Sequence, residues 1–150
     1  MIRYFSGPQN TEVMNELRPI VLIDDDVDDI DMLVEAYKAL PYKNELLTFH
    51  DSSEAYHYLT KNTVVPCLII SDMLMPKLTG LELYEKLRAF TGFKEYYIPF
   101  VFFSGAPVPP PTMGDNDLIM HYYFEKQCDF GELKKLLDTI IRQHSAIIME

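Results

Sequence analysis

Tryptophan is absent from this sequence of 150 residues, cysteine occurs only twice, and lysine and arginine form no cluster. Cys67 and Cys128 have no CxxC or other metal-binding spacing, which favours a reducing compartment, the cytoplasm, over secretion. The formal net charge of −10 serves solubility and argues against binding to nucleic-acid phosphates. No apolar run reaches the roughly 20 residues of a membrane helix, and the first residues lack the apolar core of a signal peptide. We therefore expect a cytoplasmic protein that binds neither nucleic acid nor membrane.

What the sequence does contain is enough apolar material for one folded domain. Hydrophobic residues make up 48% and aromatic residues 13% of the chain. The length suits one domain with a real core and is too short for two ordinary ones. We predict an N-terminal extension at 1–17, a domain at 18–145 and a C-terminal tail at 146–150.

Short apolar runs alternate with segments of helical periodicity along this domain. The predicted strands are 19–24, 45–50, 67–72, 98–105 and 121–126, and the predicted helices are 28–40, 51–60, 81–90 and a last helix capped by Asp129. Such alternation predicts an α/β fold with a doubly wound, five-stranded parallel sheet in the flavodoxin-like order 2-1-3-4-5. Four prolines within 106–116 leave room for only a shortened fourth helix, around 117–120.

Polar residues stand where several of these strands end. Asp24 and Asp25 end the first, Asp72 the third, Ser104 the fourth and Lys126 the fifth. A parallel sheet brings these ends to one edge, and carboxylates gathered there repel one another unless a cation relieves them. Mg²⁺ prefers such oxygen ligands. It would leave Asp72 ionised as a nucleophile toward phosphorus, with Lys126 and Ser104 placed to meet phosphoryl oxygens.

The segments LIDDD, SDMLMPKLTG, FFSG and YFEK together resemble the receiver domains of response regulators. The resemblance covers residues 18–145 and implies a signalling domain rather than an enzyme. A histidine kinase or phosphotransfer protein would donate the phosphoryl group. Output would pass through protein contacts to an unknown partner, with a homodimer as one option. The resemblance assigns these roles: Asp72 as phosphoacceptor; Asp25 as direct metal ligand; Asp24 as a ligand partly through water; the Leu74 main-chain carbonyl as a further ligand; Ser104 as hydroxyl switch; Lys126 as phosphate-binding lysine; Tyr123 as switch aromatic.

The sequence departs from the family pattern after the lysine and beside the phosphoacceptor. The family usually has proline after the lysine, often in a cis peptide, whereas Gln127 follows here. Because a cis bond before a non-proline residue costs about 2.5–4 kcal/mol, we expect the bond between Lys126 and Gln127 to be trans or visibly strained. Leu74 and Ala106 occupy positions that tune phosphoryl lifetime in the family. Neither can orient water, so we expect slow autodephosphorylation.

Other interpretations of the same residues stay open at this point. Tyr123 also fits an ordinary sheet aromatic with its hydroxyl in water. The further acids Asp26, Asp28, Asp29 and Asp31 are expected to be surface or cap residues. The spacing Asp24-x-Asp26 partly mimics haloacid-dehalogenase phosphatases, although that leaves Asp72 unexplained. A receiver fold that works as a phosphorylation-independent interaction module is the remaining alternative.

Overall fold

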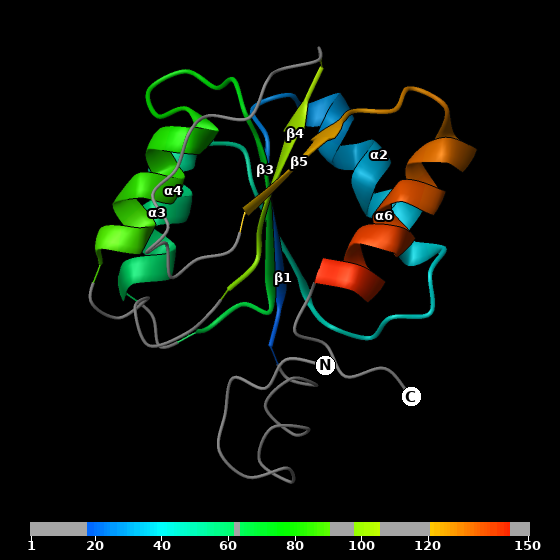
Figure 1. The fold of residues 1–150 in the computed structure, drawn as a ribbon, viewed down its shortest axis with the longest axis horizontal. Coiled ribbons are helices and arrows are strands. Elements are labelled where there is room, and N and C mark those ends of the chain that lie inside the picture. The colour runs from blue at the N-terminus through cyan, green and yellow to red at the C-terminus, as the bar shows by residue number, and fades with distance from the viewer. Residues whose placement is uncertain (1–17, 62–63, 91–97, 106–120, 145–150) are drawn as a thin grey trace, which may run out of the picture.

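The computed structural model describes residues 18–61, 64–90, 98–105 and 121–144. Five parallel strands form its sheet in the order β2-β1-β3-β4-β5, as the sequence predicted (Figure 1). The strands are β1 (Ile20–Ile23), β2 (Leu46–Phe49), β3 (Leu68–Asp72), β4 (Phe100–Ser104) and β5 (His121–Glu125). Each lies within one or two residues of its predicted range.

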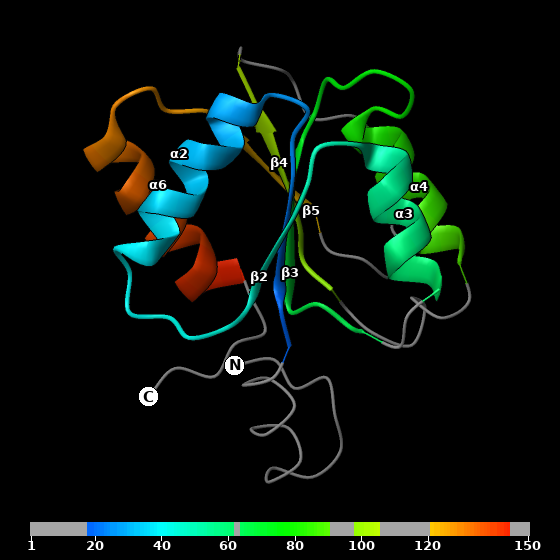
Figure 2. The same cartoon turned by 180° about the vertical axis from the view of Figure 1, so that it is seen from behind.

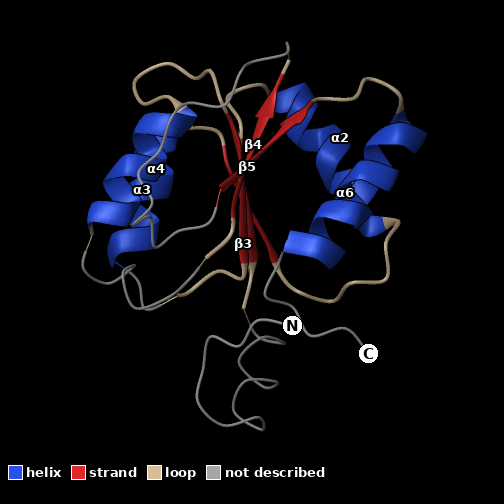
Figure 3. Ribbon diagram, in the orientation of Figure 1, coloured by secondary structure: helices blue, strands red, loops and turns tan. Residues whose placement is uncertain are grey.

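Helices cover both faces of the sheet, which makes a three-layer sandwich (Figure 3). α2 (Val27–Lys38) and α6 (Phe130–His144) pack on one face, and α3 (Ser52–Lys61) and α4 (Gly80–Ala89) on the other, as the view from behind also shows (Figure 2). The doubly wound flavodoxin-like fold predicted from the sequence is therefore confirmed.

Burial on both faces explains why the central strands are continuous apolar runs. The four residues of β1 are all at most 1% exposed, and the residues of β3 before Asp72 at most 2%. Alternate residues along a strand face opposite layers, so Ile20 and Leu22 join the core under α2 and α6, whereas Val21 and Ile23 join the core under α3 and α4. Each buried aliphatic side chain contributes about 1.5–3 kcal/mol to folding.

The helices begin at residues that satisfy their first N–H groups. Asp26 accepts hydrogen bonds from the N–H groups of the following turn at the start of α2, and Asp129 does so at α6, as predicted. α4 begins with a full capping box between Thr79 and Glu82, which is not among the features predicted from the sequence.

Some predictions fall outside the described residues. These are the extension at 1–17, the tail at 146–150 and the short helix at 117–120, so the proposed domain limits remain a prediction. Within the described part of the chain all peptide bonds are trans, including the bond between Lys126 and Gln127, as expected. No described helix is both long and apolar enough to cross a bilayer.

Candidate functional site

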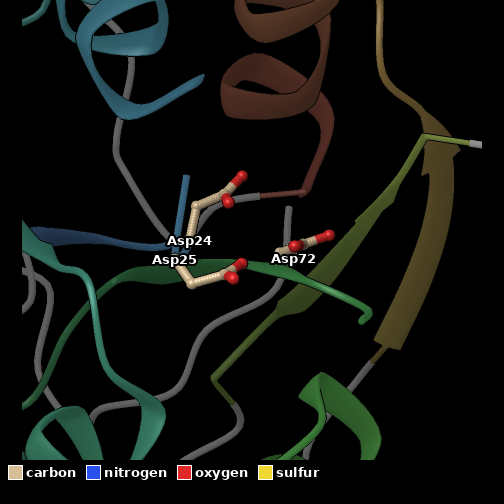
Figure 4. A group of neighbouring side chains, drawn as sticks. All are labelled: Asp24, Asp25 and Asp72. Carbon is tan, nitrogen blue, oxygen red and sulfur yellow. The ribbon is translucent and has the colours of Figure 1, made fainter. Parts of the chain in front are cut away.

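Three carboxylates converge beyond the carboxyl ends of β1 and β3. Asp24 and Asp25 follow β1 directly, and Asp72 is the last residue of β3. Carboxylate oxygens of the three lie within 4.8 Å of one another, and their side chains reach the same space (Figure 4). Asp24 and Asp72 are buried, whereas Asp25 is exposed. The predicted acidic cluster thus exists, with one member open to solvent.

Lys126 brings a positive charge into this cluster from the end of β5. Its Nζ lies 2.9 Å from Oδ2 of Asp24 and 3.4 Å from Oδ1 of Asp72. The main-chain N–H of Lys126 donates to the carbonyl of Ser104 at 2.7 Å, which fixes the residue beside the end of β4. An ammonium between two buried carboxylates offsets part of their repulsion.

Burial and charge together perturb the titration of these groups. Burial, followed by the charge of Asp24, raises the pKa of Asp72 from 3.8 to about 6, although Lys126 and a hydrogen bond from the Leu74 N–H act in the opposite direction. Burial likewise raises the pKa of Asp24. For Lys126, burial alone would lower the pKa, but its hydrogen bonds to Asp29 and Asp24 outweigh burial and raise it. The lysine therefore stays charged, whereas the raised pKa of Asp72 brings its ionisation closer to neutral pH.

The loop from Asp72 to α4 passes close to the site. The N–H of Gly80 donates to the carbonyl of Met73 at 2.9 Å, and a Cβ on Gly80 would overlap the main-chain carbonyl oxygen of Asp72. Only glycine therefore lets α4 begin this close to β3. The Leu74 side chain is 69% exposed, while its main chain lies beside the Asp72 carboxylate.

Ser104 and Tyr123, the two predicted switch residues, lie on neighbouring strands. Ser104 is buried at the end of β4 and pairs in register with Glu125 of β5. The Tyr123 ring stacks on Phe102, with 4.9 Å between ring centroids, and its hydroxyl oxygen is shielded from solvent. This burial contradicts the alternative in which Tyr123 is a sheet aromatic with its hydroxyl in water.

A family model for the response regulator receiver domain matches residues 20–138. The chain belongs to the response regulator receiver family. Receiver domains accept phosphoryl groups in two-component signalling and interact with kinases or phosphotransfer proteins. They are signalling domains rather than classical enzymes. The match spans the whole described sheet and most of α6.

Solved receiver structures share this fold at low identity. The phosphorylated cyanobacterial phytochrome response regulator RcpA is 24% identical over 84% of this chain and 92% of its own, with a TM-score of 0.66. The Mn²⁺-bound form of response regulator Rcp1 is 22% identical over 84% and 93%, with a TM-score of 0.64. CheY4 of Vibrio cholerae is 20% identical over 83% and 98%, with a TM-score of 0.61. At these identities the likeness bears on the fold alone. The comparison with curated protein sequences gave no match.

Receiver domains bind a divalent metal, and the residues of this one fit such an ion. Oxygens of Asp24, Asp25 and Asp72 within 4.8 Å of one another are close to the roughly 3–4 Å that separates ligands in an octahedron with Mg²⁺–oxygen bonds of about 2.0–2.1 Å. The donors are hard anionic oxygens, and two of them are buried with pKa values raised by burial. A cation placed among them would stabilise both as carboxylates.

Sequence reasoning missed one contact of this receiver domain. Asp29, expected to be a surface or cap residue, accepts a hydrogen bond from Lys126 at 2.7 Å across 97 residues of sequence. Its neighbour Asp26 does act as a cap, as expected. The signal that could have found Asp29 is its place in the first turn of α2, the helix that starts at the edge of the sheet carrying the site.

Proposed function

We propose that this receiver domain accepts a phosphoryl group on Asp72 from a histidine kinase or phosphotransfer protein, in a Mg²⁺-dependent step. The supporting observation is that three carboxylates and Lys126 converge where β1, β3 and β5 end. Asp24, Asp25 and the Leu74 carbonyl would hold the metal together with Asp72. The free thiols of Cys67 and Cys128 suit a reducing, cytoplasmic location.

Asp72 is the nucleophile in this proposal. One carboxylate oxygen forms a bond to phosphorus while the bond from phosphorus to the donor imidazole nitrogen breaks, and the imidazole leaves with the electron pair. When bound, Mg²⁺ supplies positive charge to the carboxylates and to the oxygens of the transferring group. Lys126 contributes a second positive charge next to Asp72 at 3.4 Å. The Lys126 charge is in place before the reaction, and a bound Mg²⁺ would add its own, as electrostatic stabilisation requires.

Ser104 and Tyr123 would then report the phosphorylated state. Ser104 is buried one residue beyond Phe103, the register partner of Asp72, and this position supports a contact between its hydroxyl and a phosphoryl oxygen. Tyr123 lies on the adjacent strand and stacks on Phe102, so a shift of Ser104 would change the packing next to Tyr123. The signal would pass from there to a protein partner.

Large exposed apolar side chains flank the site and suit contact with a phosphodonor protein. They are Val27 at 54%, Leu74 at 69% and Phe130 at 43% exposed. Val27 follows the cap of α2, Leu74 follows Asp72 by two residues, and Phe130 begins α6. Apolar contacts around the site would let a partner protein bind without neutralising the charges of the site.

The structure weakens the phosphatase alternative. In that interpretation Asp26 would share the catalytic site with Asp24. Instead, Asp26 accepts hydrogen bonds from the N–H groups of Asp28 and Asp29 and serves as the cap of α2. Asp72 and Lys126 occupy the site in its place. A phosphorylation-independent interaction module remains the competitor that experiment must separate.

Phosphoramidate with Mg²⁺, followed by intact-mass measurement, tests the proposal. The wild-type chain should gain one phosphoryl group, the gain should be lost with EDTA, and Asp72→Asn should gain none. Asp28→Asn, which removes the same charge from an exposed position on α2, should behave like the wild type. No mass gain in the wild-type chain would support the interaction module instead.

The phosphoryl lifetime is a separate proposal. The exposed apolar side chain of Leu74 cannot orient a water molecule toward Asp72. Ala106, the other position concerned, lies outside the described residues. We expect slow autodephosphorylation, and a half-life of seconds after removal of the phosphodonor would contradict it. Leu74→Asn, which introduces a hydrogen-bonding side chain, should accelerate the loss.

A further inference from the structure

The carboxylate nearest to the Lys126 ammonium does not belong to the acidic cluster. Nζ of Lys126 lies 2.7 Å from Oδ2 of Asp29, 2.9 Å from Asp24 and 3.4 Å from Asp72. The lysine side chain is 20% exposed, so these contacts form at the boundary between the site and solvent. Asp72, the proposed phosphoacceptor, is thus the most distant of the three carboxylates around the lysine.

An ammonium group has three N–H donors. Two of them are engaged at short distance by Asp29 on α2 and Asp24 after β1, and the third is left for Asp72. A lysine side chain has many rotamers to lose when it is fixed, so one anchor alone would fix it poorly. Two anchors from different elements define where the charge stands relative to Asp72.

Asp29 stands on a packed helix, with its side chain 39% exposed. It lies in the first turn of α2, where its N–H donates to Asp26 at 3.3 Å. The next residue, Ile30, is 3% exposed, and Ile30 and Leu33 anchor the helix in the core shared with α6. A carboxylate on a packed helix can hold the lysine in one place, which a loop residue could not do as well.

The ordinary role of an acid in this position is to complement the helix dipole. Asp28 meets that need equally well, because it lies in the same first turn and is exposed. The structure records a contact with Lys126 for Asp29 and none for Asp28. The two neighbours therefore form a matched pair with the same charge and the same helix, only one of which contacts the lysine.

We propose that Asp29 is a positioning residue that holds the Lys126 ammonium back from Asp72 and so keeps room for the phosphoryl group between them. The inference rests on the proposed function. At 3.4 Å the lysine is close to the phosphoacceptor without forming its shortest contact there. Phosphoryl oxygens added to Asp72 would extend toward an ammonium already in place. Without Asp29, Lys126 would close onto Asp72 and pair with the nucleophile before the donor arrives.

Phosphorylation rates of matched variants test this proposal at saturating Mg²⁺ and phosphoramidate. Asp29→Ala should lower the rate about fivefold, the scale of one charge-assisted hydrogen bond partly screened by water. Asp29→Asn keeps an acceptor oxygen and should recover part of the loss. Asp28→Ala should leave the rate unchanged. The ¹H–¹⁵N signal of the Lys126 ammonium should change its chemical shift in Asp29→Ala, where the group pairs with Asp72 instead of Asp29, and keep its position in Asp28→Ala.

Each outcome decides the matter. Equal rates in Asp29→Ala and the wild type overturn the inference, and so does an equal fall in both alanine variants, which would report the helix dipole or net charge. A slower rate with an unchanged Lys126 signal also overturns it. A wild-type chain that gains no phosphate overturns the proposed function together with this inference, whereas a phosphorylated wild type with an unaffected Asp29→Ala overturns this inference alone.

Discussion

Replacing Asp72 with asparagine should stabilise the metal-free fold, and more so as the pH rises. Burial, with the nearby charge of Asp24, raises the pKa of Asp72 from 3.8 to about 6. Between these values the folded state keeps a proton that the unfolded chain has lost. The stability that this group contributes is complete below pH 3.8 and is lost as the pH rises through about 6.

The size of the loss follows from the separation of the two pKa values. From 3.8 to about 6, at about 1.4 kcal/mol for each pH unit, the free energy of unfolding falls by roughly 2 to 3 kcal/mol. Asparagine does not ionise, so Asp72→Asn escapes this loss while keeping an oxygen near Lys126. The difference in unfolding free energy between variant and wild type should therefore grow by that amount between pH 4 and pH 7.

Urea denaturation in EDTA, followed by circular dichroism at several pH values, measures this difference. Asp28→Asn serves as the control for net charge. Effects of the substitution that do not depend on pH add the same amount to the unfolding free energy at every pH. The quantity to compare is therefore the change with pH of the difference in unfolding free energy between variant and wild type. Parallel curves for Asp72→Asn and the wild type from pH 4 to pH 7 would show that Asp72 is not held in a buried, charge-repelling site.

Four more outcomes are expected from the same structure. Gly80→Ala should lower the free energy of unfolding by about 1–3 kcal/mol, because the new Cβ overlaps the Asp72 carbonyl oxygen. Gly105→Ala, where a Cβ meets nothing within 4 Å, should be near neutral in the same urea titration. Thr79→Ala removes the oxygen that accepts the Glu82 N–H and should cost about 1 kcal/mol, visible as a lower melting temperature. Mg²⁺ at about 100 times its Kd should add about 2.7 kcal/mol to the wild type and much less to Asp72→Asn, and equal gains would place the metal elsewhere.

The sequence predicted the sheet and the acidic cluster because both follow from strong, local rules. Apolar runs such as those of β1 and β3 can be strands buried on both faces, and parallel strands bring their last residues to one edge. Asp24, Asp25 and Asp72 could therefore be placed together without coordinates. The burial of Asp24 and Asp72 and the exposure of Asp25 could not be predicted, because they depend on how the surrounding elements pack at that edge.

The contact between Asp29 and Lys126 lay beyond this reasoning. It joins residues 97 apart in sequence, and its length depends on how a helix and the end of an edge strand approach each other. Periodicity places Asp29 on the side of α2 but does not say which charge it meets. The capping box of Thr79 and Glu82 was within reach of a sequence rule, since the pattern is local.

Successive side chains of β5 face opposite sides of the sheet, and this determines which core would respond to a change at the site. Tyr122 and Phe124 pack on the core of α2 and α6, whereas Tyr123, between them, packs on the core of α3 and α4. The sheet acts as a partition between two separate interiors. A rotation of Tyr123 would change the packing of the core under α3 and α4. The core under α2 and α6, which supports the helix that carries Asp29, would keep its packing.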